Sequence, residues 1–185
     1  MPDQTLLENQ GEILRLIAKI KTTPHGDRSI KSIDTDSTTI EVLIFDAVMT
    51  SAGSQFGHVA IDIDGVIYSR AHSRYAIIPD GEGFRRSNLK IRDFEGLVLR
   101  VSPTEKSKIA KELRRRAEVD APYNIANNSC STNIADVLES IGILSHDPRF
   151  QFEPESTDMV SPKEILIVVS RSKRLAKRNH YLKSP

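Results

Sequence analysis

The sequence of 185 residues lacks most features of membrane, disulfide-rich and nucleic-acid-binding proteins. It holds a single cysteine, so an internal disulfide is excluded and folding requires no oxidising compartment. No apolar run approaches the roughly 20 residues of a membrane span. The net charge of +1 predicts no strong electrostatic attraction to nucleic acid or to a membrane surface. There is also no internal repeat and no low-complexity segment.

The two ends of the chain give further expectations. Residues 1–9 are acidic and polar, unlike a secretory signal, so we expect synthesis in the cytoplasm. If the protein acts outside its cell, a dedicated bacterial secretion system would have to deliver it. From Arg171 onward every charged residue is basic, which we interpret as a solvated, frayed helix end.

Hydrophobic periodicity and capping signals predict an α+β fold, in which helices pack on a small antiparallel β-sheet. A capping box and an apolar stripe predict a helix over residues 5–21, followed by a connector over 22–38. Residues 71–92 are expected to be irregular and basic. The remaining expected elements are strands at 39–49, 56–63, 66–70 and 96–101 and helices at 103–118, from Cys130 to Gly142, and from Pro162. The expected divisions are 1–38 (helix and connector), 39–170 (one domain) and 171–185 (basic tail).

Cys130 occupies the first turn of an expected helix. Ser129 or Asn128 can cap that helix, and the apolar residues after Cys130 recur at helical spacing, so the sulfur faces inward. The positive end of the helix dipole favours the nucleophilic thiolate form of a cysteine. The alternative is a buried cysteine that serves as a small hydrophobic residue, which is the commoner role of a lone cysteine.

His58 is the histidine best placed to act as a base for that cysteine. Gly57 precedes it and allows close backbone approach within a strand. His58 alternates with aliphatic residues, so it lies on the opposite face of its strand from them. A histidine on a sheet, facing the start of a cysteine helix, forms the pair that thiol catalysis needs. Taken alone, His58 would more often be a half-buried structural residue.

The residue that would orient His58 is less defined by the sequence. Asp64-Gly65 predicts a two-residue hairpin, which sets Ala60 against Ser69 and leaves Ser69 diagonal to His58 on the same face. Asp46 on the preceding strand is an alternative, whereas His72 is expected to point away in the absence of a bulge. A His58–Cys130 dyad with no third residue also satisfies the pattern.

Two groups are candidates for binding the oxyanion of the reaction. One is the backbone N–H of Cys130, and the other is a side-chain amide from Asn127 or Asn128. The sequence predicts no metal site and no cofactor.

These residues resemble circularly permuted papain-like hydrolases, in which the histidine strand precedes the cysteine helix. The matching pieces are Gly57-His58 with the following hairpin, Tyr123-Asn124, and the segment Asn128-Ser129-Cys130-Ser131-Thr132. The Ser161-Pro162 helix start also fits. Ser69 stands where NlpC-type members often carry an acidic or amide residue. The resemblance covers residues 39 to about 170.

Two branches of that group imply different substrates. Permuted NlpC-type amidases cut peptidoglycan peptides, and some are effectors delivered by type VI secretion. PPPDE-type isopeptidases remove ubiquitin-like modifiers. The resemblance implies a cysteine amidase or peptidase with Cys130 as nucleophile and His58 as base, acting on a peptide or peptidoglycan substrate. It also implies a secretion-machinery, immunity or host protein as a partner. A host-directed protease or acyl hydrolase, or a degenerate effector that only binds a host protein, are the alternatives.

Overall fold

The computed structural model describes residues 5–9, 12–15, 38–48, 55–147 and 159–183, with backbone alone for 5–15. The chain divides into two compact units, residues 1–38 and 39–185. In the first unit, β1 (Thr5–Asn9) pairs antiparallel with β2 (Glu12–Arg15). All other described elements belong to the second unit.

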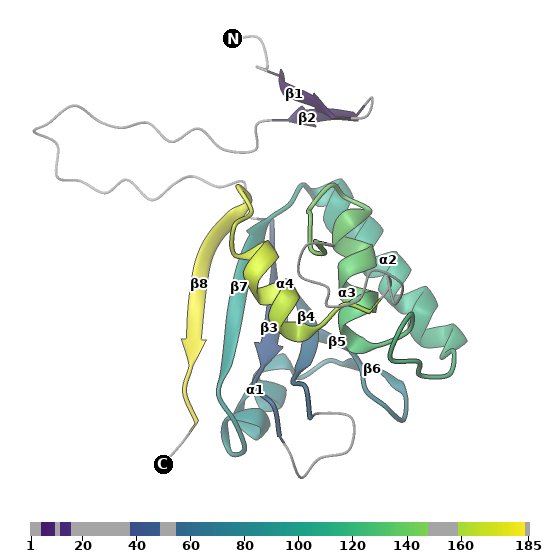
Figure 1. The fold of residues 1–185 in the computed structure, drawn as a ribbon, viewed down its shortest axis with the longest axis vertical. Coiled ribbons are helices and arrows are strands. Elements are labelled where there is room, and N and C mark those ends of the chain that lie inside the picture. Colours follow the sequence, from purple (N-terminus) through teal and green to yellow (C-terminus); the bar gives the residue numbers. More distant parts are fainter. Residues whose placement is uncertain (1–4, 10–11, 16–37, 49–54, 148–158, 184–185) are drawn as a thin grey trace, which may run out of the picture. The chain divides into compact units, whose positions relative to one another are not determined.

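The second unit is built on a six-stranded antiparallel sheet with the order β6-β5-β4-β3-β7-β8 (Figure 1). The strands are β3 (Thr39–Phe45), β4 (His58–Ile63), β5 (Val66–Arg70), β6 (Tyr75–Ile78), β7 (Phe94–Arg100) and β8 (Leu175–Tyr181). Four helices accompany it: α1 (Gly81–Leu89), α2 (Pro103–Val119), α3 (Cys130–Glu139) and α4 (Pro162–Val169). The expected α+β class, with helices packed on an antiparallel sheet, is confirmed.

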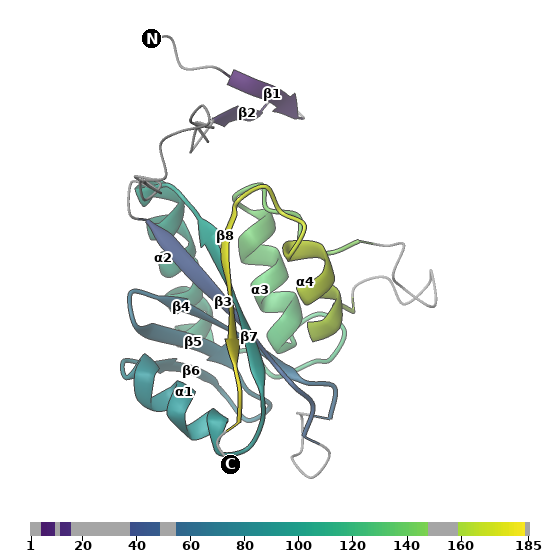
Figure 2. The same ribbon diagram turned by 90° about the vertical axis from the view of Figure 1, so that its left-hand side faces the viewer.

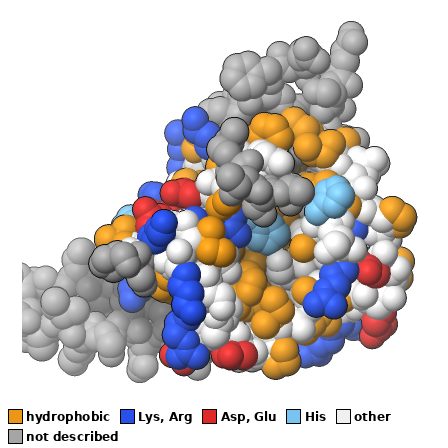
Figure 3. Space-filling view, turned by 90° about the horizontal axis from the view of Figure 1, so that it is seen from below, with side chains coloured by type: hydrophobic (Ala, Val, Ile, Leu, Met, Phe, Trp, Pro, Cys, Tyr) orange, Lys and Arg blue, Asp and Glu red, His pale blue; other side chains and the backbone are white. Residues whose placement is uncertain are grey.

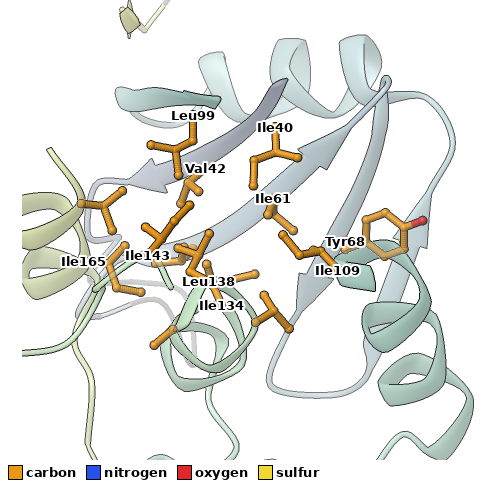
Figure 4. Close-up of a cluster of buried hydrophobic side chains, with 14 of the residues drawn as sticks. Ile40, Val42, Ile61, Tyr68, Leu99, Ile109, Ile134, Leu138, Ile143 and Ile165 are labelled. Carbon is orange, nitrogen blue, oxygen red and sulfur yellow. The ribbon is translucent and has the colours of Figure 1, made fainter. Parts of the chain in front are cut away.

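The helices cover the two faces of the sheet unequally. Helices α3 and α4 lie on the opposite side of the sheet from α1 (Figure 2). The larger core joins α2, α3 and α4 to the sheet, and side chains such as Ile61, Ile109 and Leu138 meet there (Figure 4). A smaller core under α1 contains Phe45, Phe84 and other residues of β3, β4, β5 and β7.

The central hairpin follows the register expected from its turn. Asp64 and Gly65 both have positive φ, as a tight two-residue turn between β4 and β5 requires. Ile63 then pairs with Val66, and Ala60 pairs with Ser69. The expected N-caps at positions 102, 129 and 161 are also present, each with its hydroxyl accepting a backbone N–H bond.

The expected helix over residues 5–21 is wrong, because residues 5–9 and 12–15 form two paired strands. Asn9 at the end of β1 and the Gly11 that precedes β2 are residue types that favour turns. The apolar residues on either side of these two positions happen to recur at helical spacing, which produced the expectation of a helix. The expected connector, apart from Thr38, lies outside the described residues.

Residues 71–92 are more regular than expected, since they contain β6 and α1. Two glycines near the start of α1 lower its intrinsic helix propensity. For this reason the sequence did not predict the helix. The Asp80 side chain compensates by accepting the Gly83 backbone N–H at 2.8 Å, as an N-cap does. Packing of Phe84 against Phe45 then holds the helix to the sheet.

The interpretation of the basic C-terminal segment as a frayed helix end is also wrong. Residues 175–181 form β8, which pairs with β7 at the edge of the sheet. Its basic side chains point largely to solvent, and Arg178 pairs with Glu95 at 2.8 Å. Charged edge strands of this kind discourage pairing with other chains. Among the described helices, none combines the length and apolar character that crossing a bilayer requires.

Candidate active site

Cys130 is the first residue of α3, and Ser129 caps that helix. The Ser129 hydroxyl accepts the backbone N–H of Thr132 at 3.2 Å, and the Thr132 hydroxyl accepts the N–H of Ser129 at 2.9 Å. No acidic side chain occupies the first turn. The positive end of the helix dipole therefore acts on the sulfur without a neighbouring carboxylate in that turn, a setting in which cysteines serve as nucleophiles.

His58 begins β4, and its ring is buried with its Nε2 atom 2.8 Å from the Ser69 hydroxyl on β5. The hairpin register places both side chains on the α1 face of the sheet, as the turn position predicted. Gly57 has a φ of +92°, and a Cβ there would meet the Phe45 carbonyl oxygen at 2.7 Å. The close approach of this strand start to β3 therefore requires glycine.

Burial, and to a smaller extent the positive charge of the nearby Arg92 guanidinium, together lower the pKa of His58 from 6.5 to about 4. The imidazole is therefore neutral at pH 7, so it can accept a proton. Because Nε2 is paired with the Ser69 hydroxyl, Nδ1 is the ring nitrogen left for proton transfer.

His58 and Cys130 line the same surface cavity, which has a volume of about 490 Å³. We call it the histidine cavity. Its polar and aromatic lining comprises His58, Ser69, Arg70, His72, Ser73, Arg74, Phe84, Asn88, Arg92 and Tyr123, together with Cys130. Seen from below, the molecule shows histidine side chains among apolar, Lys and Arg side chains (Figure 3).

Within the described residues, no hydrogen bond joins Cys130 to His58. The Cys130 sulfur lies 3.7 Å from the Ser131 hydroxyl instead. The structure thus brings the expected pair to one cavity without the direct bond that the sequence led us to look for. Hydrogen bonds between catalytic groups often tighten only when substrate binds.

Arg92 is a cavity residue that sequence analysis missed. Its Nε and one terminal nitrogen donate to the Asn88 side-chain oxygen at 3.2 and 3.0 Å, and the other donates to the Asp46 carbonyl at 3.2 Å. The guanidinium carbon lies 4.8 Å from the centre of the Phe45 ring. Its charge contributes to the lowered pKa of His58, and burial lowers the pKa of Arg92 itself. The i, i+4 spacing of Asn88 and Arg92 was the available signal, but it lay in a stretch expected to be irregular.

The loop before Cys130 is braced by its asparagines. The side-chain oxygen of Asn124 accepts the backbone N–H of Ala126 at 2.8 Å, and Asn124 and Asn128 form a backbone bridge. The Asn128 amide donates to the carbonyls of Ala121 and Pro122 at 3.1 and 2.7 Å. Both amide hydrogens are thereby used, so the expected role of Asn128 as an oxyanion donor does not fit the structure. Its role is to hold the loop.

The other residues that the sequence suggested for the site lie in different surroundings. Asp46 is exposed, and in the described part of the chain it makes no hydrogen bond to His58. His72 does not point away as expected, because β5 ends at Arg70 and the following loop brings His72 to the cavity wall. There its ring centre lies 4.9 Å from that of Tyr123. Asn127 is exposed in the loop that precedes Cys130.

A second cavity, of about 300 Å³, borders Cys130 and Tyr123 on another side. We call it the apolar cavity. Its lining is dominated by Phe56, Ile125, Met159, Val160 and Pro162. Cys130 itself is only 6% exposed, as a structural cysteine would be, yet it contributes to the walls of both cavities. Around neither cavity, nor elsewhere in the described residues, do three or more His, Cys, Asp or Glu side chains cluster as a metal site.

No protein-family model and no curated protein matches this sequence. Among solved structures, the type VI secretion system effector TseH is similar, with a TM-score of 0.46 and 14% sequence identity. The match covers 78% of this chain and 97% of that one.

Proposed function

We propose that this chain is a cysteine-dependent amide hydrolase. Cys130 is the nucleophile, His58 is first the general base and then the general acid, and Ser69 orients the imidazole. The observation that carries the proposal is the shared cavity: its walls include the thiol at the capped start of α3 and a neutral histidine whose Nε2 atom is held by the Ser69 hydroxyl.

The reaction proceeds by two acyl transfers. His58 takes the thiol proton as the sulfur attacks the carbonyl carbon, and it then gives that proton to the leaving nitrogen as the C–N bond breaks. Water attacks the resulting thioester while His58 accepts a proton from it. The thioester C–S bond then breaks, releasing a carboxylic acid and restoring the thiol.

The oxyanion formed in each step needs preorganised donors. The backbone N–H of Cys130 lies at the start of α3, where no earlier helical carbonyl can accept it, and no other described group does so. With Asn128 committed to the loop, the helix start is the main donor site that the geometry supports.

The substrate predicted from the resemblance is a peptidoglycan stem peptide. The lining of the histidine cavity contains three arginines and no aspartate or glutamate, which suits a peptide that carries carboxylates. Delivery by a secretion system, and a partner from that system, an immunity protein or a host protein, remain predictions from the sequence.

The test incubates the purified chain with muropeptides and, separately, with conjugates of a ubiquitin-like modifier. The Cys130→Ala variant is the negative control, and Ser87→Ala, at an exposed residue of α1 that lines neither cavity, is the matched control. We expect new muropeptide products by mass spectrometry that are lost in Cys130→Ala only. Cleavage of the conjugates alone would move the assignment to an isopeptidase. No cleavage of either, with Cys130 labelled by iodoacetamide equally fast in folded and unfolded protein, would favour a binding protein with a structural cysteine.

A further inference from the structure

Resting on the proposed function, we infer the polarity of the substrate: an apolar acyl group on one side of the scissile bond and an anionic leaving group on the other. Cys130 and Tyr123 form a wall common to the histidine cavity and the apolar cavity. A substrate whose carbonyl carbon lies at the sulfur therefore extends into both.

The position of His58 decides which half of the substrate enters which cavity. The general acid must stand next to the atom that it protonates, and that atom belongs to the leaving group. His58 lines the histidine cavity and is absent from the lining of the apolar cavity. The leaving group therefore occupies the histidine cavity, and the acyl group that becomes attached to Cys130 occupies the apolar cavity.

The apolar cavity has the chemistry of an acyl-binding pocket. Phe56, Ile125 and Met159 contribute to its lining although they are 76%, 50% and 45% exposed. Large apolar side chains that remain exposed beside a nucleophile gain most if a ligand covers them. A volume of about 300 Å³ suits a large apolar side chain or a short acyl chain.

The histidine cavity has the chemistry of an anion-binding pocket. Arg70 is buried and donates to the carbonyls of Ala71 and Ala121, so its role is structural. Arg74 is exposed, and among the described residues its guanidinium has no carboxylate partner. Arg92 is bonded to neutral oxygens. Within the described part of the chain, neither guanidinium therefore forms a direct ion pair, although the Asp46 carboxylate attracts Arg92, and both remain for a carboxylate on the leaving group.

The experiment measures acyl transfer from thioesters to Cys130, which does not require complete turnover. In each transfer the thiolate attacks the thioester carbonyl, the acyl group becomes bonded to Cys130, and the leaving thiolate is released. Probes are acetyl and hexanoyl thioesters of thionitrobenzoate, which is anionic, and of thiopyridine, which carries no carboxylate. Release of the leaving group gives the rate, normalised to the intrinsic reactivity of each probe with free cysteine. Intact mass identifies the acylated protein.

We expect hexanoyl probes to react roughly tenfold or more faster than acetyl probes, and thionitrobenzoate probes several-fold faster than thiopyridine probes. Ile125→Asp should remove the chain-length preference and leave the leaving-group preference. Arg74→Gln should do the reverse. The matched controls are Leu144→Asp, which is also exposed and apolar, and Arg86→Gln on the outer side of α1; both should keep both preferences.

Two outcomes contradict this inference and are distinguishable. If Cys130 is acylated at equal rates by all probes, the substrate polarity is wrong while the proposed hydrolase stands. If the folded protein is acylated by none of them, as in Cys130→Ala, the proposed function fails and the inference fails with it.

Discussion

The two faces of the sheet differ in composition. One face carries most of the hydrophobic core, and the other carries the polar residues of the candidate site. The face under α2, α3 and α4 is lined almost entirely by buried aliphatic side chains, with Leu138 and Ile61 fully enclosed. The α1 face carries a small aromatic cluster, and beside it lie charged groups: Arg85 on α1 pairs with Glu41 and Asp62 at 2.5 and 2.7 Å.

His58 and Ser69 belong to this second, more polar face. Phe45 pairs with His58, and Ala60 with Ser69, and both partners contribute to the smaller core under α1. The histidine cavity is lined by His58 of β4, by the end of β5 and by Phe84 and Asn88 of α1, and its lining also includes Cys130 of α3. The proposed nucleophile, Cys130, lies on a helix packed against the aliphatic face, whereas the proposed base, His58, lies on the α1 face.

The largest expected effect is on catalysis by His58→Ala. Removing the base should lower kcat/KM by about 10² to 10⁴-fold. The free energy of unfolding at pH 7 should fall by less than in an aliphatic core variant, because burying the imidazole desolvates its polar nitrogens and gains one hydrogen bond to a hydroxyl in return. Leu138→Ala on the other face is the contrasting variant, with a destabilisation of about 2–5 kcal/mol.

Urea unfolding and initial rates, measured on both variants, test this separation. A His58→Ala variant that keeps its activity would remove His58 from the mechanism. Equal losses of stability in the two variants would contradict the division between the faces.

The next effect concerns stability against pH. The pKa of His58 is about 4 in the folded protein and 6.5 in the unfolded chain, so only the unfolded state binds this proton between those values. The free energy of unfolding should therefore fall as the pH drops from 6.5 to 4, by about 3 kcal/mol from this group. In His58→Gln, which cannot titrate, that part of the decrease should be missing.

Urea unfolding of both proteins at pH 7 and near pH 4.5 measures the difference, since other titrating groups contribute equally to both. The same pH dependence in both proteins would mean that His58 is charged, or solvated, in the fold.

The smallest effect is expected for Ser69→Ala. The hydroxyl holds Nε2 of the imidazole, and its loss frees the ring to rotate, which should lower kcat roughly tenfold with KM nearly unchanged. Ser69→Thr keeps the hydroxyl and should restore part of the rate. Steady-state kinetics on the three proteins measures this. A rate for Ser69→Ala equal to that of the natural chain would show that Cys130 and His58 act as a dyad.

The register of the candidate site could be predicted from the sequence because short-range rules govern it. The Asp64-Gly65 turn fixes how β4 and β5 pair, and a strand period of two then sets Ser69 on the face of His58. In the same way, the Ser129 cap and the apolar spacing after it fix the start of α3 at Cys130.

Elements with weak local signals could not be predicted. The helix α1 has glycines in its first turn and depends on the Asp80 cap and on contacts with Phe45. The strand β8 depends on the open edge of β7, a partner more than 70 residues earlier in the chain. Local propensity carries no information about such a partner, so the basic segment looked like a solvated helix end.

By itself, the sequence determined the α+β class, the central hairpin, the capped helices, the position of Cys130 at a helix start and the register that sets Ser69 on the face of His58. Only the tertiary structure decided how deeply Cys130 and His58 are buried and which charged and apolar groups surround them. It buried His58 beside Arg92, committed the Asn128 amide to its own loop, and put an arginine-lined cavity and an apolar cavity around one sulfur. Turns and caps are set by neighbours in the chain, whereas burial and charge depend on residues that only folding brings together.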